Sequence, residues 1–93
     1  MFEGKEVIVR TWSAGVHFGT LVRQEGTEVV LHDARRIWRW TEAFTLSAVA
    51  VNGVGPASKL CVTVPETILT EAIEIIPCTE KSAAILRGLP AHA

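Results

Sequence analysis

The stretch KEVIVRTWSAGVHFGTLVRQEGTEVVLHDARRIWRW, residues 5–40, decides the fold. It contains three runs that are rich in β-branched and aromatic residues, at 5–12, 16–24 and 27–34. The short turn signals SAG and EG separate these runs, and each is brief enough to join neighbouring antiparallel strands. The sequence therefore predicts an antiparallel meander of three strands.

The basic end of this stretch, RRIWRW at 35–40, continues the third strand. A straight strand from Thr27 to Trp40 would be far longer than the usual length of about five or six residues. We therefore expect a kink or a bulge near Asp33 to Arg35.

The remainder of the chain predicts further elements of both kinds. TLSAVAVNG (45–53) is typical of a short helix with Thr45 as its N-cap, and KLCVTV (59–64) alternates as a strand does. TEKSAAILRG (79–88) predicts a second helix, capped by Thr79. The segment between them, 65–78, fits both periods; its isoleucines and Pro77 favour a strand, and a helix stays open as the alternative.

Length and composition indicate one globular domain over residues 1–93. The chain is 48% hydrophobic and 20% charged, which is too apolar for a disordered protein. The expected fold class is β-rich α+β. We expect a small bent antiparallel sheet or barrel of about five strands, with one or two short helices.

Charge and hydropathy exclude several classes of protein. The formal net charge of -1 gives no global basic field, so a nucleic-acid-binding protein is disfavoured. No run approaches the roughly 18 apolar residues of a membrane span, and the first six residues lack the pattern of a secretory signal. We expect a cytoplasmic protein with no membrane partner.

The cysteines and histidines predict neither a metal site nor a cofactor. Cys61 and Cys78 lack CxxC spacing and are expected to be two buried thiols, and a disulfide between them stays open as the alternative. The histidines at 17, 32 and 92 show no metal-ligand spacing. The sequence contains no cofactor-binding signature.

Four blocks carry a resemblance to a known family: VIVRTWSAGVHFGTL, VVLHDARRIWRW, AFTLSAVAVNGV and LTEAIEIIPCTE. In this order they resemble a small protein family encoded by tailed bacteriophages and prophages. The likeness extends from about Val7 to about Glu80. It implies an accessory phage protein made in the bacterial host cytoplasm, and it supplies no catalytic residues.

The sequence contains no convincing catalytic set. Ser13, His17 and Asp33 are the residue types of a hydrolytic triad, but Ser13 does not lie in a GxSxG elbow. Three common polar residues in a meander are more typical of turn chemistry. We expect a protein that is not an enzyme.

The segment RTWSAGVHFG predicts a place for an anion. Arg10 and Trp12 share a strand face, and the small residues Ser13, Ala14 and Gly15 would let a phosphate approach backbone amides. The structural alternative is that Gly15 only serves a tight turn and Trp12 is a core or edge residue.

The cluster DARRIWRW (33–40) concentrates arginine and tryptophan. Alternation places Arg36, Trp38 and Trp40 on one face, and Arg35, Ile37 and Arg39 on the other. Arginine forks bind phosphate and tryptophan stacks on bases, which suits a nucleotide; the same residues suit a protein interface. The alternative puts Trp38 in the core with arginine stems over apolar surface, and one tryptophan could lie inside and the other outside.

The resulting hypothesis is a non-enzymatic binding protein for an anionic small molecule such as a linear or cyclic nucleotide. In a phage this would mean counter-defence by sequestering a host signal. The alternatives are an inhibitor that binds a host protein through an Arg/Trp surface and, less favoured, a nucleic-acid-binding protein. The candidate ligand-binding residues are Arg10, Trp12, Ser13, Ala14, Gly15, His17, Arg35, Arg36, Trp38, Arg39 and Trp40.

Two structural expectations accompany this hypothesis. Arg10 and Arg36 would converge if their strands were neighbours, because same-face side chains on adjacent strands lie within about 5 Å. A small sheet also has edges to cover, so we expect a homo-oligomer.

Overall fold

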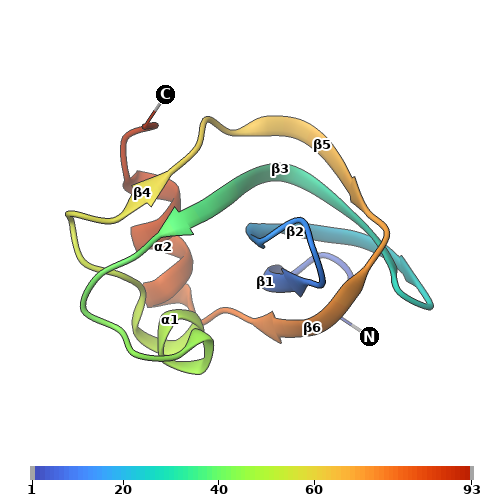
Figure 1. Cartoon of the computed structure of the whole chain (residues 1–93), viewed down its shortest axis with the longest axis horizontal. Coiled ribbons are helices and arrows are strands. Elements are labelled where there is room, and N and C mark those ends of the chain that lie inside the picture. Colours follow the sequence, from blue (N-terminus) through green and yellow to red (C-terminus); the bar gives the residue numbers. More distant parts are fainter. Residues whose placement is uncertain (1, 93) are drawn as a thin grey trace.

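Residues 2–92 are described by a computed structural model of the chain (Figure 1). In chain order the elements are β1 (Glu6–Thr11), β2 (Val16–Glu25), β3 (Glu28–Arg39), α1 (Leu46–Asn52), β4 (Lys59–Leu60), β5 (Val64–Leu69), β6 (Ala72–Pro77) and α2 (Glu80–Gly88). All strand pairs are antiparallel, in the order β4-β3-β2-β1-β6, and β5 pairs with the first half of β3. No ladder in the described range joins β5 to β6, so the sheet curves without closing. The β-rich α+β class is confirmed, as a bent sheet of six strands within this range.

The meander predicted from the opening stretch is confirmed. In β1 and β2, Ile8 lies opposite Phe18, and in β2 and β3, Phe18 lies opposite Arg35. Glycine occupies left-handed backbone in both connecting turns, with φ of 84° at Gly15 and 60° at Gly26. A residue with a Cβ atom is strained in these conformations, so both turns depend on glycine.

Strand β3 bends at Asp33, where the sequence predicted a kink. Asp33 has a φ of 50°, and the pairing with β2 shifts there from Thr20 opposite His32 to Phe18 opposite Arg35. The shift inserts one extra residue into β3, which is a β-bulge. Because of it, Arg35 lies on the same face of the sheet as Phe18.

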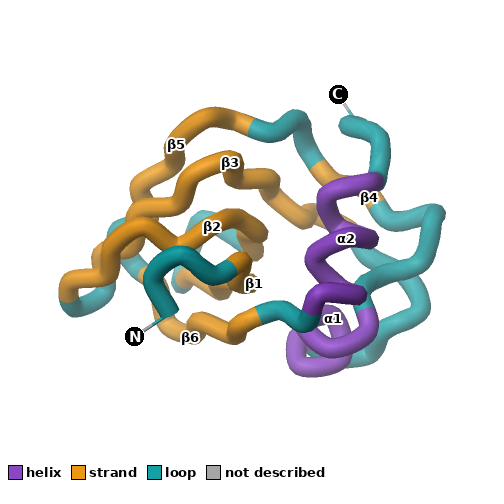
Figure 2. The backbone as a smooth tube through the Cα atoms, turned by 180° about the vertical axis from the view of Figure 1, so that it is seen from behind, coloured by secondary structure: helices purple, strands orange, loops and turns teal. Residues whose placement is uncertain are grey.

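Both predicted helices are confirmed with their N-caps. The Thr45 side chain accepts a hydrogen bond from the Ala48 amide, and the Thr79 side chain accepts one from the Ser82 amide, each at 3.1 Å. Figure 2 shows α1 and α2 together on one side of the sheet. No helix formed by residues 2–92 is long and apolar enough to cross a membrane.

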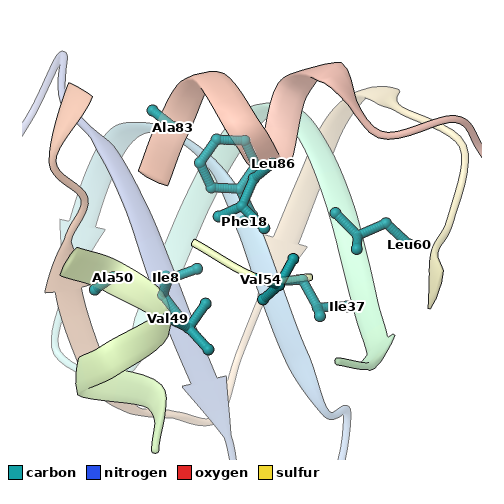
Figure 3. Packing of buried hydrophobic residues seen from close by; sticks show 9 residues of the cluster. All are labelled: Ile8, Phe18, Ile37, Val49, Ala50, Val54, Leu60, Ala83 and Leu86. Atoms are coloured by element: carbon teal, nitrogen blue, oxygen red, sulfur yellow. The ribbon is translucent and has the colours of Figure 1, made fainter. Parts of the chain in front are cut away.

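The first hydrophobic core lies between the sheet and the helices. Its buried members, seen in Figure 3, are Ile8, Phe18, Ile37, Val49, Ala50, Val54, Leu60, Ala83 and Leu86. The second core lies on the opposite, concave face of the sheet. It consists of Val7, Val9, Leu21, Val29, Leu31, Ala34 and Leu69. The central strands are thus buried on both faces, which explains the unbroken apolar run at the start of β1.

The strand predicted over 59–64 is wrong at 61–63. Strand β4 ends at Leu60 and β5 begins at Val64. Leu60 pairs with Ile37, and Val64 pairs with Ala34, so the edge segment advances four residues while β3 advances three. The residues between them leave the ladder to absorb this difference.

The segment 65–78 is extended, so the helical alternative is wrong, but it forms two strands instead of one. Thr70 and Glu71 separate β5 from β6. Thr27 holds this break, because its hydroxyl donates to the Thr70 carbonyl and its own carbonyl accepts from the Ala72 amide, both at 3.0 Å. Strand β5 therefore pairs with β3 and β6 with β1, at opposite edges of the sheet.

Arg35 is a structural residue, which corrects its assignment to the ligand surface. Its side chain is 3% exposed. It donates to the carbonyls of Cys61 at 2.9 Å and Leu86 at 2.7 Å, and so joins β3 to the edge segment and to α2. Burial and the nearby charge of Arg87 lower the pKa of Arg35, but a guanidinium stays charged in proteins.

We predict that Arg35→Ala lowers the free energy of unfolding by about 3 kcal/mol, because two partly or fully buried carbonyls lose a charged donor. Urea denaturation followed by circular dichroism measures this change. Arg39→Ala, in the same run but exposed, is the matched control and should stay within about 0.5 kcal/mol of the parent. Equal stability of the two variants would contradict the structural role of Arg35.

Candidate functional site

The concave face of the sheet opens into a hollow of about 270 Å³ beyond its core. We call it the inner hollow. It is lined by His17, Ala34, Arg36, Cys61, Val62, Val64 and Thr67. The irregular segment at 61–63 forms one wall, so the local break between β4 and β5 creates part of the site.

A second hollow of about 410 Å³ lies along the turn between β1 and β2. We call it the outer hollow. It is lined by Ser13, Ala14, Gly15, Val16, Arg36, Ile37, Trp38 and Trp40. Arg36 lines both hollows. The volume of the outer hollow is in the range of pockets that bind small molecules. We refer to the two together as the mouth.

Arg36 is the cation at the centre of the mouth. It is exposed, and it makes no ion pair or side-chain hydrogen bond with any described residue. Arg39 and Lys59 likewise have no ionic partner in the range 2–92, and they lie directly opposite each other on β3 and β4. Like charges in this position repel each other. The sheet therefore presents three unneutralised cations at one end.

The position of Arg39 differs from the alternation predicted from sequence. The pairing of β3 with β4 shifts between Ile37 and Arg39, which inserts a second irregularity. Leu60 faces the helix-side core, so its neighbour Lys59 points to the other face of the sheet. Arg39 is paired with Lys59 and therefore points to that other face too. Arg39 does not share a face with Ile37.

One tryptophan of the cluster is turned inward and the other outward. Trp40 is half-buried, packs against the helix-side core and donates its Nε1–H to the Ala43 carbonyl at 3.2 Å. Trp38 is 50% exposed, which excludes the core position that one alternative gave it. Its ring lies 5.4 Å from the His92 ring, at an interplanar angle of 47°.

The turn at 12–15 lines the mouth but uses some of its polar groups internally. The Ala14 amide donates to Thr11 Oγ1 at 2.9 Å, and the Ser13 hydroxyl donates to Glu71 Oε1 at 2.7 Å. Gly15 has positive φ, as the tight-turn alternative requires. The small residues leave space beside Arg36, while their hydrogen bonds hold the turn in shape.

Arg10 and Trp12 lie apart from the mouth. Arg10 is opposite Val16, whereas Arg36 is opposite His17, so the two arginines lie on opposite faces of the sheet with β2 between their strands. The expected convergence of Arg10 with Arg36 is therefore wrong. Arg10 instead pairs with Glu74 at 3.2 Å. Trp12 is 77% exposed and lines neither hollow.

His17 is buried at the base of the inner hollow. Its Nε2 atom lies 2.9 Å from the Ala14 carbonyl, so Nε2 carries the hydrogen. Burial lowers the pKa of His17; the hydrogen bond to Ala14 opposes this, and the nearby charge of Arg36 adds to it. His17 is thus a neutral ring at neutral pH.

The residues of the imagined hydrolytic triad are not joined to one another. Ser13 bonds to Glu71, and His17 bonds to a backbone carbonyl. Within residues 2–92 no group of histidine, cysteine and acidic side chains could hold a metal ion. Both cysteines are free and half-buried, and burial raises the pKa of the Cys78 thiol to about 11.

Sequence reasoning missed several residues of the mouth, and it missed Lys59, which lines neither hollow but lies opposite Arg39. Lys59 could have been paired with Arg39 only if the register of β3 were known. Val62 and Val64 line the inner hollow because the chain leaves the ladder over 61–63, and the alternating pattern of 59–64 hides that break. Cys61 was expected to be buried and instead lines the inner hollow.

The lowered pKa of His17 predicts a pH dependence of stability. In the unfolded chain the ring takes up a proton near pH 6.5, and in the folded chain only at lower pH. The unfolded state therefore binds more protons in this window, and the free energy of unfolding falls as the pH drops from about 6.5 towards the folded pKa. Above that window His17 contributes no pH dependence.

Urea denaturation at a series of pH values between about 7.5 and 5 tests this, because most carboxyl groups titrate lower. The variant His17→Gln keeps an N–H for the Ala14 carbonyl but does not titrate, so its stability should fall less than that of the parent. Parallel curves for the two proteins would contradict the prediction.

A family model matches most of the chain. A family model described as a domain of unknown function, DUF6948, matches residues 4–86. No curated protein and no solved structure matches the chain. The matched range contains all six strands, α1 and both hollows of the mouth. The chain therefore belongs to the DUF6948 family of domains of unknown function.

Proposed function

We propose that this protein binds a small anionic molecule in the mouth and releases it unchanged. A nucleotide is the natural candidate, because it offers a phosphate for Arg36 and a base for Trp38. The observation that carries the proposal is Arg36 itself, an arginine shared by both hollows and without an anionic partner among the described residues.

Electrostatics supports an anionic ligand. Three other arginines have acidic partners: Arg10 pairs with Glu74, Arg23 with Glu25 and Glu28, and Arg87 with Glu6. In contrast, Arg39 and Lys59 repel each other across β3 and β4, at a cost of the order of 1 kcal/mol for exposed charges. A bound phosphate would convert this repulsion into charge-assisted hydrogen bonds.

The exposed face of Trp38 supports a planar group on the ligand. Base stacking on an aromatic side chain contributes about 1 to 3 kcal/mol per base. His92 already lies against Trp38, which indicates that the indole accepts a ring partner. A base would take the place of the imidazole or extend the stack.

The biological setting stays a proposal that rests on the resemblance to phage and prophage proteins. In that setting the protein would act in the cytoplasm of the bacterial host and withdraw a nucleotide signal from a defence system. The absence of a catalytic signature in the sequence supports sequestration over turnover.

A second candidate is an inhibitor that binds a protein of the host. Trp12 favours it, because this indole is 77% exposed and lines neither hollow. Tryptophan and arginine are enriched among the residues that dominate protein interfaces. Trp12 and Trp38 therefore separate the two candidates.

We predict that Arg36→Ala weakens the binding of AMP by about tenfold or more, because the phosphate loses a charge-assisted donor. Isothermal titration calorimetry measures the affinity. Arg23→Ala removes an exposed arginine on β2 and the same charge, so it is the matched control and should bind as the parent does. Both variants should unfold within about 0.5 kcal/mol of the parent.

The tryptophans extend the experiment. Trp38→Ala should weaken AMP binding, and Trp12→Ala should leave it unchanged. If no linear or cyclic nucleotide binds the parent, or if Arg36→Ala binds AMP as tightly as the parent, the nucleotide proposal is wrong.

Self-association is a separate proposal. Several apolar side chains of β5 and β6 are exposed, among them Ile68 at 56% and Ile73 at 50%. Exposed apolar edge strands favour pairing with another chain. We expect multi-angle light scattering at micromolar concentration to give the mass of a dimer or a larger homo-oligomer; a monomer mass would contradict this expectation.

A further inference from the structure

The inner hollow combines a hydrogen-bond donor with an acceptor. His17 and Arg36 lie directly opposite each other on β2 and β3, and both line the hollow. Side chains in this relation have Cβ atoms about 5 Å apart. One small ligand group can therefore contact both.

The acceptor is the second nitrogen of His17. Nε2 donates to the Ala14 carbonyl, so in the neutral ring Nδ1 has a lone pair and no hydrogen. Nδ1 has no hydrogen-bond partner among the described residues. Every side-chain nitrogen or oxygen that is fully buried in the described chain does have a partner, so Nδ1 is not fully buried. Nδ1 must then be open to solvent, and the hollow is where this otherwise buried residue meets it.

The neutral state of His17 persists because its surroundings disfavour a second proton. His17 is 4% exposed and lies beside the charge of Arg36, and both features lower the pKa of its ring. Nδ1 therefore stays an acceptor at neutral pH.

The walls of the hollow make this acceptor selective. Ala34, Val62 and Val64 make most of the lining apolar. The Cys61 thiol and the Thr67 hydroxyl are the other polar groups of the lining, and neither is hydrogen-bonded to Nδ1. An anion that enters must satisfy Arg36 with its negative oxygen and Nδ1 with a hydrogen. An oxyanion without a hydrogen would place a lone pair against a lone pair, and a polar group left unpaired in such a site is costly.

We propose that the inner hollow binds a phosphate group that retains one proton, with Arg36 donating to its charged oxygens and His17 Nδ1 accepting from its P–O–H. This inference deepens the proposed function and rests on it. Inorganic phosphate retains a proton at neutral pH, whereas a phosphate monoester retains one only as its monoanion, the form that predominates below its second pKa of about 6. Sulfate at neutral pH and phosphodiesters, including cyclic nucleotides, have no proton on the oxyanion and are excluded by this requirement.

The test compares inorganic phosphate with sulfate by isothermal titration calorimetry at pH 7. Sulfate carries the larger charge there, so electrostatics alone predicts that sulfate binds more tightly. We expect the reverse, with phosphate about tenfold tighter, since a tenfold ratio is what one well-formed hydrogen bond typically provides. Equal affinities, or tighter sulfate, overturn the inference.

A comparison of AMP with cyclic AMP extends the test to nucleotides. At pH 7 most AMP is the dianion, so its affinity should rise as the pH is lowered from about 7.5 to about 6.5. The affinity of cyclic AMP, whose phosphodiester has no proton to donate, should not rise over this range. AMP that binds more tightly than inorganic phosphate identifies a nucleotide monoester as the ligand class, and equal affinity identifies free phosphate. An affinity for AMP that does not rise as the pH is lowered over this range overturns the inference.

Variants at His17 provide a readout that a purely structural role would not move. His17→Leu removes the acceptor, so the ratio of phosphate to sulfate affinity should fall to about one or below. His17→Gln offers both an N–H and an acceptor oxygen and should retain part of the ratio. If His17→Leu does not fold, the parent and His17→Gln still decide, because a ratio near one in the parent is sufficient to reject the inference.

Failure of the proposed function gives a different pattern. In that case Arg36→Ala leaves the affinity for both anions unchanged, or neither anion binds the parent. If only the further inference fails, both anions still bind through Arg36, and only the preference for phosphate over sulfate is absent.

Discussion

The bend of β3 at Asp33 is the constraint on which the rest of the structure depends. A left-handed backbone at this one residue inserts an extra position into the strand and reverses the side-chain alternation that follows. Without it, Arg35 would point to the concave face, and the buried hydrogen bonds to the edge segment and α2 could not form. The same shift directs Arg36 into the mouth beside His17. One backbone conformation thus separates a structural arginine from a solvent-facing one.

The sheet is covered on both faces over part of its length and open over the remainder. The helices cover one face, and the curvature of the sheet encloses the apolar side chains of the other. Towards the end near the turn between β1 and β2, His17 and Arg36 interrupt the apolar lining of the enclosed face. Ligand sites often occur at the mouths of curved or closed sheets for this reason, since the scaffold behind them is rigid. The mouth has this position relative to the concave core.

Much of the fold could be predicted because local signals determine it. The two helices follow from Thr45 and Thr79, whose hydroxyl groups cap the first turn whatever the tertiary structure. The bend of β3 followed from strand length alone. The break between β4 and β5 could not be predicted, because it results from a register mismatch between two strands that are distant in sequence. The candidate site shared this limit: Arg36 and Trp38 were found from composition, but the separation of Arg10 from Arg36 depends on which strand lies between them.

The two thiols differ in reactivity and in position, so the natural protein can be labelled at the mouth without a mutation. Cys78 is half-buried and its raised pKa keeps it protonated at neutral pH, so it is protected against reagents that attack the thiolate. Cys61 lines the inner hollow beside Arg36. A thiol-directed fluorophore should therefore attach at the rim of the site in the natural protein. Its emission would report directly on whatever enters the mouth.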